Sequence, residues 1–163
     1  MRLILFGILA FSVWALSPGA PFPAVEAETL AGGKLRLPDA AKGKTALVVV
    51  TFSKEAGDAS RPWCTRFLKD SPNGQLFQIA MLEKAPRLVR GLIRRGMRGE
   101  MPPALQGRML LLYAGEAEWR KTVGVTNDAY PCLATLDAEG RITWFYQGPF
   151  DESAYQKLRQ HAL

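Results

Sequence analysis

The sequence predicts an α/β domain in which a central mixed sheet lies between two layers of helices. Residues 46–52 and 76–82 are near-continuous apolar and β-branched runs, which are typical of strands covered on both faces of a parallel sheet. Helical patterns alternate with these runs along the chain. The sequence then ends in a hairpin followed by a helix, which adds an antiparallel edge to the sheet.

Each expected element has a local signal. Gly32 and Gly33 lie at the centre of residues 25–37, which alternate as a short hairpin does. Pro62 suits the first turn of a helix, and Asp151 suits the cap of the last one. In chain order we expect strands at 46–52, 76–82, 109–113, 132–137 and 141–147, and helices at 62–69, 86–97, 116–123 and 152–161.

Composition narrows the possible functions. The chain has 163 residues, of which 48% are hydrophobic, so it is long enough for one domain with a core. The two cysteines, Cys64 and Cys132, and the single histidine, His161, are too few for a disulfide scaffold or a zinc site. No phosphate loop or nucleic-acid motif is present. We therefore expect no metal, no cofactor and no nucleic-acid partner.

The N-terminus has the pattern of an export signal. Arg2 precedes an apolar run at residues 3–16, and small residues follow. The run is shorter than the roughly 20 residues of a membrane-spanning helix. We expect a cleaved signal at 1–20, cut after Ala15 or Ala20, and a domain at 21–163, with an uncleaved anchor as the alternative. Either way the domain is expected in the periplasm or another extracytoplasmic space.

The formal net charge is +6, and much of it lies in one expected helix. Its apolar residues recur at helical spacing and are expected to pack on the sheet. The other side forms a basic face with no acidic residue between Lys84 and Glu100; it comprises Arg87, Arg90, Arg94, Arg95 and Arg98. Such a face suits an anionic membrane surface or an acidic protein partner, and it also fits a merely solvated surface.

Three segments together resemble a known superfamily. They are the leader from Pro23 to Leu37, the stretch from Val123 to Tyr130-Pro131, and the block at 133–142 followed by Gly148. Their order is similar to that of the thioredoxin superfamily, in the branch of peroxiredoxins and periplasmic cytochrome-maturation thioredoxins, over about residues 20–162. The resemblance implies a thioredoxin-like three-layer sandwich with a cis peptide bond at Pro131.

The resemblance also implies a redox site at the start of the helix after the first core strand. The superfamily places a Cys-x-x-Cys motif there, and the best-placed tetrad here is Ser60-Arg61-Pro62-Trp63, which has no thiol. We therefore expect a redox-inactive protein that binds or assembles a client. Its expected binding groove comprises Ser60, Arg61, Pro62, Trp63, Tyr130 and Pro131, and an extended peptide would enter it by strand addition.

An enzyme is the alternative. Cys64 directly follows the tetrad, so it is the candidate catalytic thiol of a thiol peroxidase or thiol-disulfide oxidoreductase. The resemblance places Cys132 against the same helix, where it would act as the resolving cysteine. Either the two thiols are close enough to bridge, or both are buried as small hydrophobic residues.

The C-terminal half has a second, narrower resemblance. Gly124-Val125-Thr126-Asn127, the strand at 133–137 and Gly140 to Trp144 are similar to the ATP synthase assembly-chaperone family of mitochondria. Trp63 and Phe67 also have that family's spacing, whereas Pro131, Cys132 and Thr143 depart from its pattern. This resemblance implies an assembly factor whose partner is a client polypeptide or a membrane complex.

Overall fold

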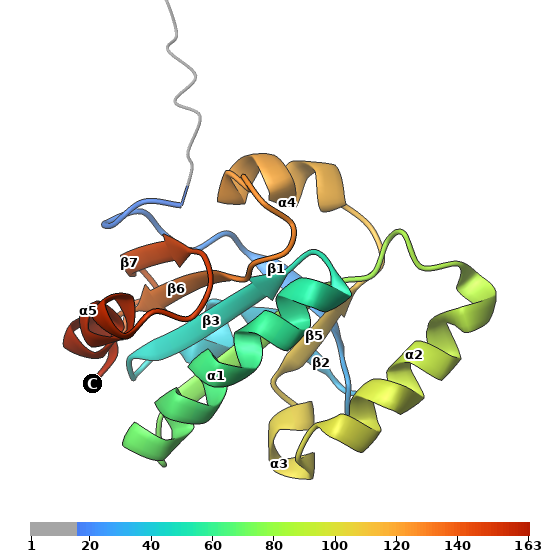
Figure 1. Cartoon of the computed structure of the whole chain (residues 1–163), viewed down its shortest axis with the longest axis horizontal. Helices are drawn as coiled ribbons and strands as arrows, with labels where there is room; N and C mark the ends of the chain where they lie inside the picture. Colours follow the sequence, from blue (N-terminus) through green and yellow to red (C-terminus); the bar gives the residue numbers. More distant parts are fainter. Residues whose placement is uncertain (1–15) are drawn as a thin grey trace, which may run out of the picture.

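The computed structural model describes residues 16–163, so most of the predicted export signal lies outside the described residues. The elements alternate as expected along the chain (Figure 1). The strands are β1 Val25–Thr29, β2 Lys34–Leu37, β3 Ala46–Thr51, β4 Gln75–Met81, β5 Met109–Leu112, β6 Cys132–Leu136 and β7 Ile142–Gln147. The helices are α1 Lys54–Asp70, α2 Arg87–Glu100, α3 Pro103–Gln106, α4 Glu116–Val123 and α5 Glu152–Ala162, with a 3-10 turn, η1, at Asp39–Ala41.

The strands form one mixed sheet in the order β2-β1-β5-β4-β3-β6-β7. β3 pairs in parallel with β4, and β4 in parallel with β5. β6 runs antiparallel to β3 and β7 antiparallel to β6, while β1 and β2 form the hairpin at the opposite edge. This is the three-layer α/β sandwich that the sequence predicts.

Helices cover both faces of the sheet. Alternate residues of β3 separate the two layers, because successive side chains of a strand point to opposite faces. Leu47 and Val49 pack with α1 and α5, through Trp63, Phe67 and other apolar residues. Val48 and Val50 pack on the other face, which α4 and the N-terminal segment cover. Every residue of β3 is buried, as its unbroken apolar run predicts.

Helix α1 begins at Lys54, and the expectation that it begins at Pro62 is wrong. Ser53 is its N-cap: the backbone is extended there, and the hydroxyl accepts a hydrogen bond from the Ala56 amide at 3.0 Å. Pro62 consequently lies inside the helix. The cap at Ser53 moves the start of α1 two turns closer to the end of β3 than the proline alone indicates.

Helix α2 also differs from expectation, because its apolar side faces solvent. Leu88 is 98% exposed and Leu92 is 72% exposed, and no residue of the helix is fully buried. Met97 alone of the expected apolar face packs with the small cluster of Leu30, Met109 and their neighbours. The predicted basic face is therefore divided into two groups. Arg90, Arg94 and Arg98 form hydrogen bonds to other parts of the domain. Arg87 and Arg95 are exposed and form no such contacts within residues 16–163.

The N-terminal segment joins the domain before the expected boundary at residue 21. Leu16 and Ala20 are each only 7% exposed, and Phe22 packs beside Trp119. The amide of Gly19 donates to the Ile142 carbonyl at 2.7 Å, and the Ile142 amide donates to Ala20 at 2.9 Å. Residues 19 and 20 thus cover the first residue of the edge strand β7. No helix among residues 16–163 is long and apolar enough to span a bilayer.

Candidate functional site

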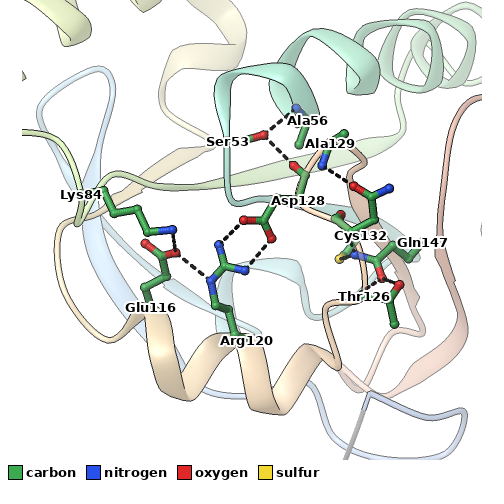
Figure 2. A network of polar contacts seen from close by, with 11 residues as sticks. Ser53, Ala56, Lys84, Glu116, Arg120, Thr126, Asp128, Ala129, Cys132 and Gln147 are labelled. Atoms are coloured by element: carbon green, nitrogen blue, oxygen red, sulfur yellow. Dashed lines mark hydrogen bonds and ion pairs between the residues drawn. The ribbon is translucent and has the colours of Figure 1, made fainter.

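The candidate site is the edge of the sheet at which the inner strand β3 ends and α1 begins. The thioredoxin resemblance places the reactive thiols there. The loop of residues 124–131, between α4 and β6, lies against this helix start (Figure 2). The Ser53 hydroxyl donates to the carbonyl of Asp128 at 2.6 Å while it accepts from the Ala56 amide. One serine therefore caps the helix and also ties the 124–131 loop to it.

Arg120, from α4, also binds the 124–131 loop. Arg120 donates from both terminal nitrogens to the carboxylate of Asp128, the longer of the two bonds being 2.7 Å, and from Nε to Glu116 at 2.7 Å. Lys84 makes a second ion pair with Glu116 at 3.1 Å, as Figure 2 shows. The hydrogen bonds from Arg120 lower the pKa of Asp128. These four charged side chains are mutually paired.

Glu116 is the buried member of this network. Its side chain is only 7% exposed. Burial alone would raise the pKa of this carboxyl, but the hydrogen bonds from Arg120 and Lys84 outweigh burial and lower it. Glu116 also opens helix α4, where its amide donates to the carboxylate of Glu83 at 2.7 Å. A negative charge is favourable at this position, because the helix dipole is positive at its N-terminus.

A glutamine of β7 fixes the other end of the loop. The side-chain oxygen of Gln147 accepts from the Thr126 amide at 3.0 Å and from the Thr126 hydroxyl at 2.7 Å. Its amide nitrogen donates to the Asn127 carbonyl at 3.3 Å and contacts the sulfur of Cys132 at 3.2 Å. The side chain of Asn127 accepts from the Ala129 amide, forming a local turn. The 124–131 loop is thus held by α1, α4 and β7 together.

The predicted cis bond at Pro131 is wrong. The cis peptide bond within residues 16–163 is Leu37–Pro38, and the bond from Tyr130 to Pro131 is trans. A turn precedes Pro131, in which the Tyr130 amide donates to the Asn127 carbonyl at 3.4 Å. Pro131 is buried and Tyr130 is half-buried. The predicted groove therefore lacks the proline geometry on which it was based.

The predicted tetrad does not lie at this edge either. Ser60 follows Ser53 by seven helical residues, so it lies about 10 Å further along α1. The Ser60 hydroxyl donates to the Gly57 carbonyl within the helix. Arg61 and Pro62 are exposed, and Arg61 forms ion pairs with Asp58 and Glu100. The tetrad is a mid-helix segment rather than the start of the helix.

Trp63 is a core residue. It is fully buried, and its ring centroid lies 5.1 Å from that of Phe150 and 5.3 Å from that of Tyr146. Tyr155 closes the same aromatic cluster at 6.3 Å. A tryptophan enclosed in this way stabilises the packing of α1 on the sheet and is not available to a peptide.

The two cysteines cannot form the suggested disulfide. Cys64 projects from α1 into the cluster on that side of the sheet, whereas Cys132 belongs to the cluster on the opposite face. Both are free. Burial raises the pKa of each thiol to about 12, so both remain protonated at neutral pH. Disulfide exchange and peroxide reduction both start from a thiolate.

Sequence reasoning missed the residues that organise this edge: Ser53, Lys84, Glu116, Arg120, Asp128 and Gln147. Three of them had readable signals. Ser53 directly follows a buried strand and precedes Lys54 and Glu55, as an N-cap does. Glu116 and Arg120 have the i, i+4 spacing of a helical ion pair. Lys84, Asp128 and Gln147 come from distant segments, and nothing in the sequence indicates that they meet.

The fold defines the protein class: a thioredoxin-like domain, whose two cysteines, Cys64 and Cys132, belong to clusters on opposite faces of the sheet. The chain belongs to the ATP10 protein family, a family of ATP synthase assembly, whose model matches residues 10–161. This confirms the second resemblance seen in the sequence, and it implies a client protein or complex. The comparison with curated proteins gives no match.

Solved structures confirm the fold. The thioredoxin domain of a thiol-disulfide oxidoreductase from Bacteroides vulgatus has a TM-score of 0.64 at 15% identity, covering 91% of this chain and 100% of that chain. The pneumococcal exposed lipoprotein thioredoxin from Streptococcus pneumoniae has a TM-score of 0.59 at 19% identity, covering 85% and 99%. A thiol peroxidase from Chromobacterium violaceum has a TM-score of 0.58 at 19% identity, covering 90% and 87%. At these identities the likeness establishes the fold alone.

Proposed function

We propose that this protein is a redox-inactive assembly factor of the ATP synthase that binds a client polypeptide outside the cytoplasm. The observation that carries the proposal is the hydrogen bond from Ser53 to Asp128, which stands where thioredoxin-like enzymes keep their thiols. The 124–131 loop is bonded to the start of α1, and burial raises the pKa of the thiols of Cys64, in the middle of α1, and Cys132, beside Gln147. The apolar run at 3–16 supports export, with or without cleavage.

The assembly role is expected to survive without thiols. In cells that lack the endogenous protein, the variant with Cys64→Ser and Cys132→Ser should restore assembled ATP synthase, measured on native gels, to within about twofold of the wild-type level, since neither thiolate forms at neutral pH. The purified wild type should neither reduce insulin disulfides nor consume peroxide. Peroxide turnover that disappears in Cys64→Ser would support the thiol peroxidase alternative and contradict the proposal.

The client is proposed to add as a strand to β7. Within residues 16–163, β2 and the part of β7 after Ile142 each have an unpaired outer edge, but the two edges differ in chemistry. β2 is short and carries exposed Lys34 and Arg36, and charged side chains of this kind discourage strand pairing. Residues 143–146 of β7 are Thr-Trp-Phe-Tyr, half-buried and uncharged. An extended apolar segment could therefore pair with β7 and cover these aromatic rings.

Photocrosslinking tests this edge with little disturbance to the fold. The ring of Trp144 stacks on that of Tyr146, with centroids 5.7 Å apart, at the open end of the aromatic cluster. A photoreactive phenylalanine analogue at position 144 should crosslink to subunits of the ATP synthase during assembly. The same analogue at Arg36, on the opposite edge, serves as the matched control. Equal crosslinking from both positions, or crosslinking from position 36 alone, would reject β7 as the client site.

A further inference from the structure

The first two turns of α2 carry an exposed apolar patch. Leu88 is 98% exposed, Leu92 is 72% exposed and Val89 is 38% exposed. Leu88 and Leu92 are four residues apart, so they lie on the same side of the helix. Within residues 16–163 the only other large hydrophobic residue with comparable exposure is the C-terminal Leu163. The exposed apolar surface is therefore concentrated in one place, which marks an interaction surface.

Polar contacts on the inner side hold the helix in this orientation. Arg94 forms an ion pair with Glu28 at 2.8 Å and donates to the Thr29 carbonyl at 3.1 Å. Arg98 donates to the Leu30 carbonyl at 2.7 Å. The guanidinium of Arg90 lies 4.6 Å from the centre of the Tyr113 ring. Turning the leucines inward would break these contacts, so the apolar side is the outer side of the folded domain.

The rim of the patch is basic. Arg87 and Arg95 flank the leucines, and both are exposed. Neither forms an ion pair or a side-chain hydrogen bond within residues 16–163, and no acidic residue lies between Lys84 and Glu100 in the sequence. Leucines bordered by arginines are the composition of helices that lie in the interface of an anionic bilayer. The positive charges of Arg87 and Arg95 are complementary to anionic headgroups and would repel a basic partner.

Helix α4 separates the N-terminal segment from the part of the chain that leads into α2 (Figure 1). The amide of Leu16 donates to the Thr122 carbonyl at 3.0 Å, near the end of α4. At the other end of α4, Glu116 pairs with Lys84 at 3.1 Å, and Lys84 precedes Arg87, the first residue of α2, by three residues. Figure 1 shows the start of the described chain and α2 on opposite sides of the domain. Any contact of the patch with a bilayer therefore depends on the leucines and arginines of α2 itself.

We propose that the first two turns of α2 lie in the headgroup region of an anionic lipid bilayer. Leu88, Val89 and Leu92 insert between the lipids, and Arg87 and Arg95 contact the lipid phosphates. The inner arginines keep the helix attached to the sheet. This surface is distinct from the client edge at β7, and the lipid contact does not depend on the proposed assembly role.

Hydrogen exchange on the full chain in vesicles tests the lipid contact. The chain is reconstituted in vesicles of phosphatidylcholine alone and in vesicles that also contain phosphatidylglycerol. Exchange of the α2 amides should slow by at least about fivefold in the anionic vesicles, the factor expected from one basic residue at such a surface. The third condition is the same chain in detergent. Exchange of the α2 amides in phosphatidylcholine vesicles should equal their exchange in detergent. Equal exchange in all three conditions would overturn the proposal.

Matched variants separate the apolar from the electrostatic contribution. Leu88→Asn with Leu92→Asn should abolish the protection, and Leu163→Asn should leave it intact; all three side chains are exposed, so the fold is retained. Arg87→Gln with Arg95→Gln should also abolish it, whereas Lys157→Gln, on the exposed side of α5, should not. Protection that depends on added ATP synthase subunits rather than on anionic lipid would assign the patch to a protein partner and overturn the lipid assignment.

Discussion

Replacing Arg120 with methionine is expected to lower the free energy of unfolding by about 2–3 kcal/mol, near the lower end for breaking a buried ion pair because the site is partly exposed. Arg120 is the shared partner of Glu116 and Asp128. Its loss leaves the buried Glu116 with Lys84 alone and removes the side-chain hydrogen bonds of the 124–131 loop with α4. The measurement is urea unfolding at neutral pH, with a matching fall in the melting temperature of about 5–10 °C.

A control on the same helix makes this result specific. Lys121 pairs with Glu118 at 3.7 Å, and both side chains are at least 75% exposed, so Lys121→Gln should change stability by less than about 0.5 kcal/mol. Adding Glu116→Gln to Arg120→Met should recover part of the loss, because the uncompensated buried charge is removed. Equal effects of Arg120→Met and Lys121→Gln would show that the network does not stabilise this edge.

Trp63→Ala is expected to cost about 3–5 kcal/mol of unfolding free energy, the usual range for emptying a buried aromatic site. The ring is enclosed by Tyr146, Phe150 and Tyr155, so its removal leaves a cavity under α1. Trp63→Phe should cost clearly less, since it keeps part of the ring. Thermal and urea unfolding of the purified domain measure both.

The neighbouring Arg61 serves as the control for Trp63. It lies on the exposed side of the same helix, so Arg61→Ala should shift stability by less than about 0.5 kcal/mol. A binding role for Trp63 predicts a different outcome, in which Trp63→Ala keeps the melting temperature of the wild type and loses only ATP synthase assembly. That outcome would restore the groove hypothesis and contradict the assignment of Trp63 to the core.

Buried strands and capped helices could be predicted from the sequence because their signals are local. The run at 46–52 became β3, the expected helix at 116–123 is α4, and the Asp151 side chain caps α5 by accepting from the Ala154 amide. The start of α1 was missed because Pro62 and Ser53 are both plausible start signals. Ser53 is the N-cap at which α1 starts. Its hydroxyl makes a second hydrogen bond, to the carbonyl of Asp128 in the 124–131 loop, which is distant in sequence.

The orientation of α2 could not be predicted, because periodicity identifies two faces without saying which one packs. An apolar stripe normally faces the core. Here the carbonyls of Thr29 and Leu30 at the end of β1 accept hydrogen bonds from Arg94 and Arg98, and those acceptors lie more than 60 residues away in sequence. The site failed to follow from the sequence for the same reason: its organising contacts join α1, α4, β7 and a loop.

The pairing of residues 19 and 20 with Ile142 has a consequence for maturation of the chain. A peptidase cut after Ala15 would leave Leu16, Gly19 and Ala20 in place, with their contacts to α4 and β7. A cut after Ala20 would remove all three residues and free both backbone groups of Ile142. The open edge of β7 would then be one residue longer. The position of such a cut would thus set how much of that edge the proposed client strand can occupy.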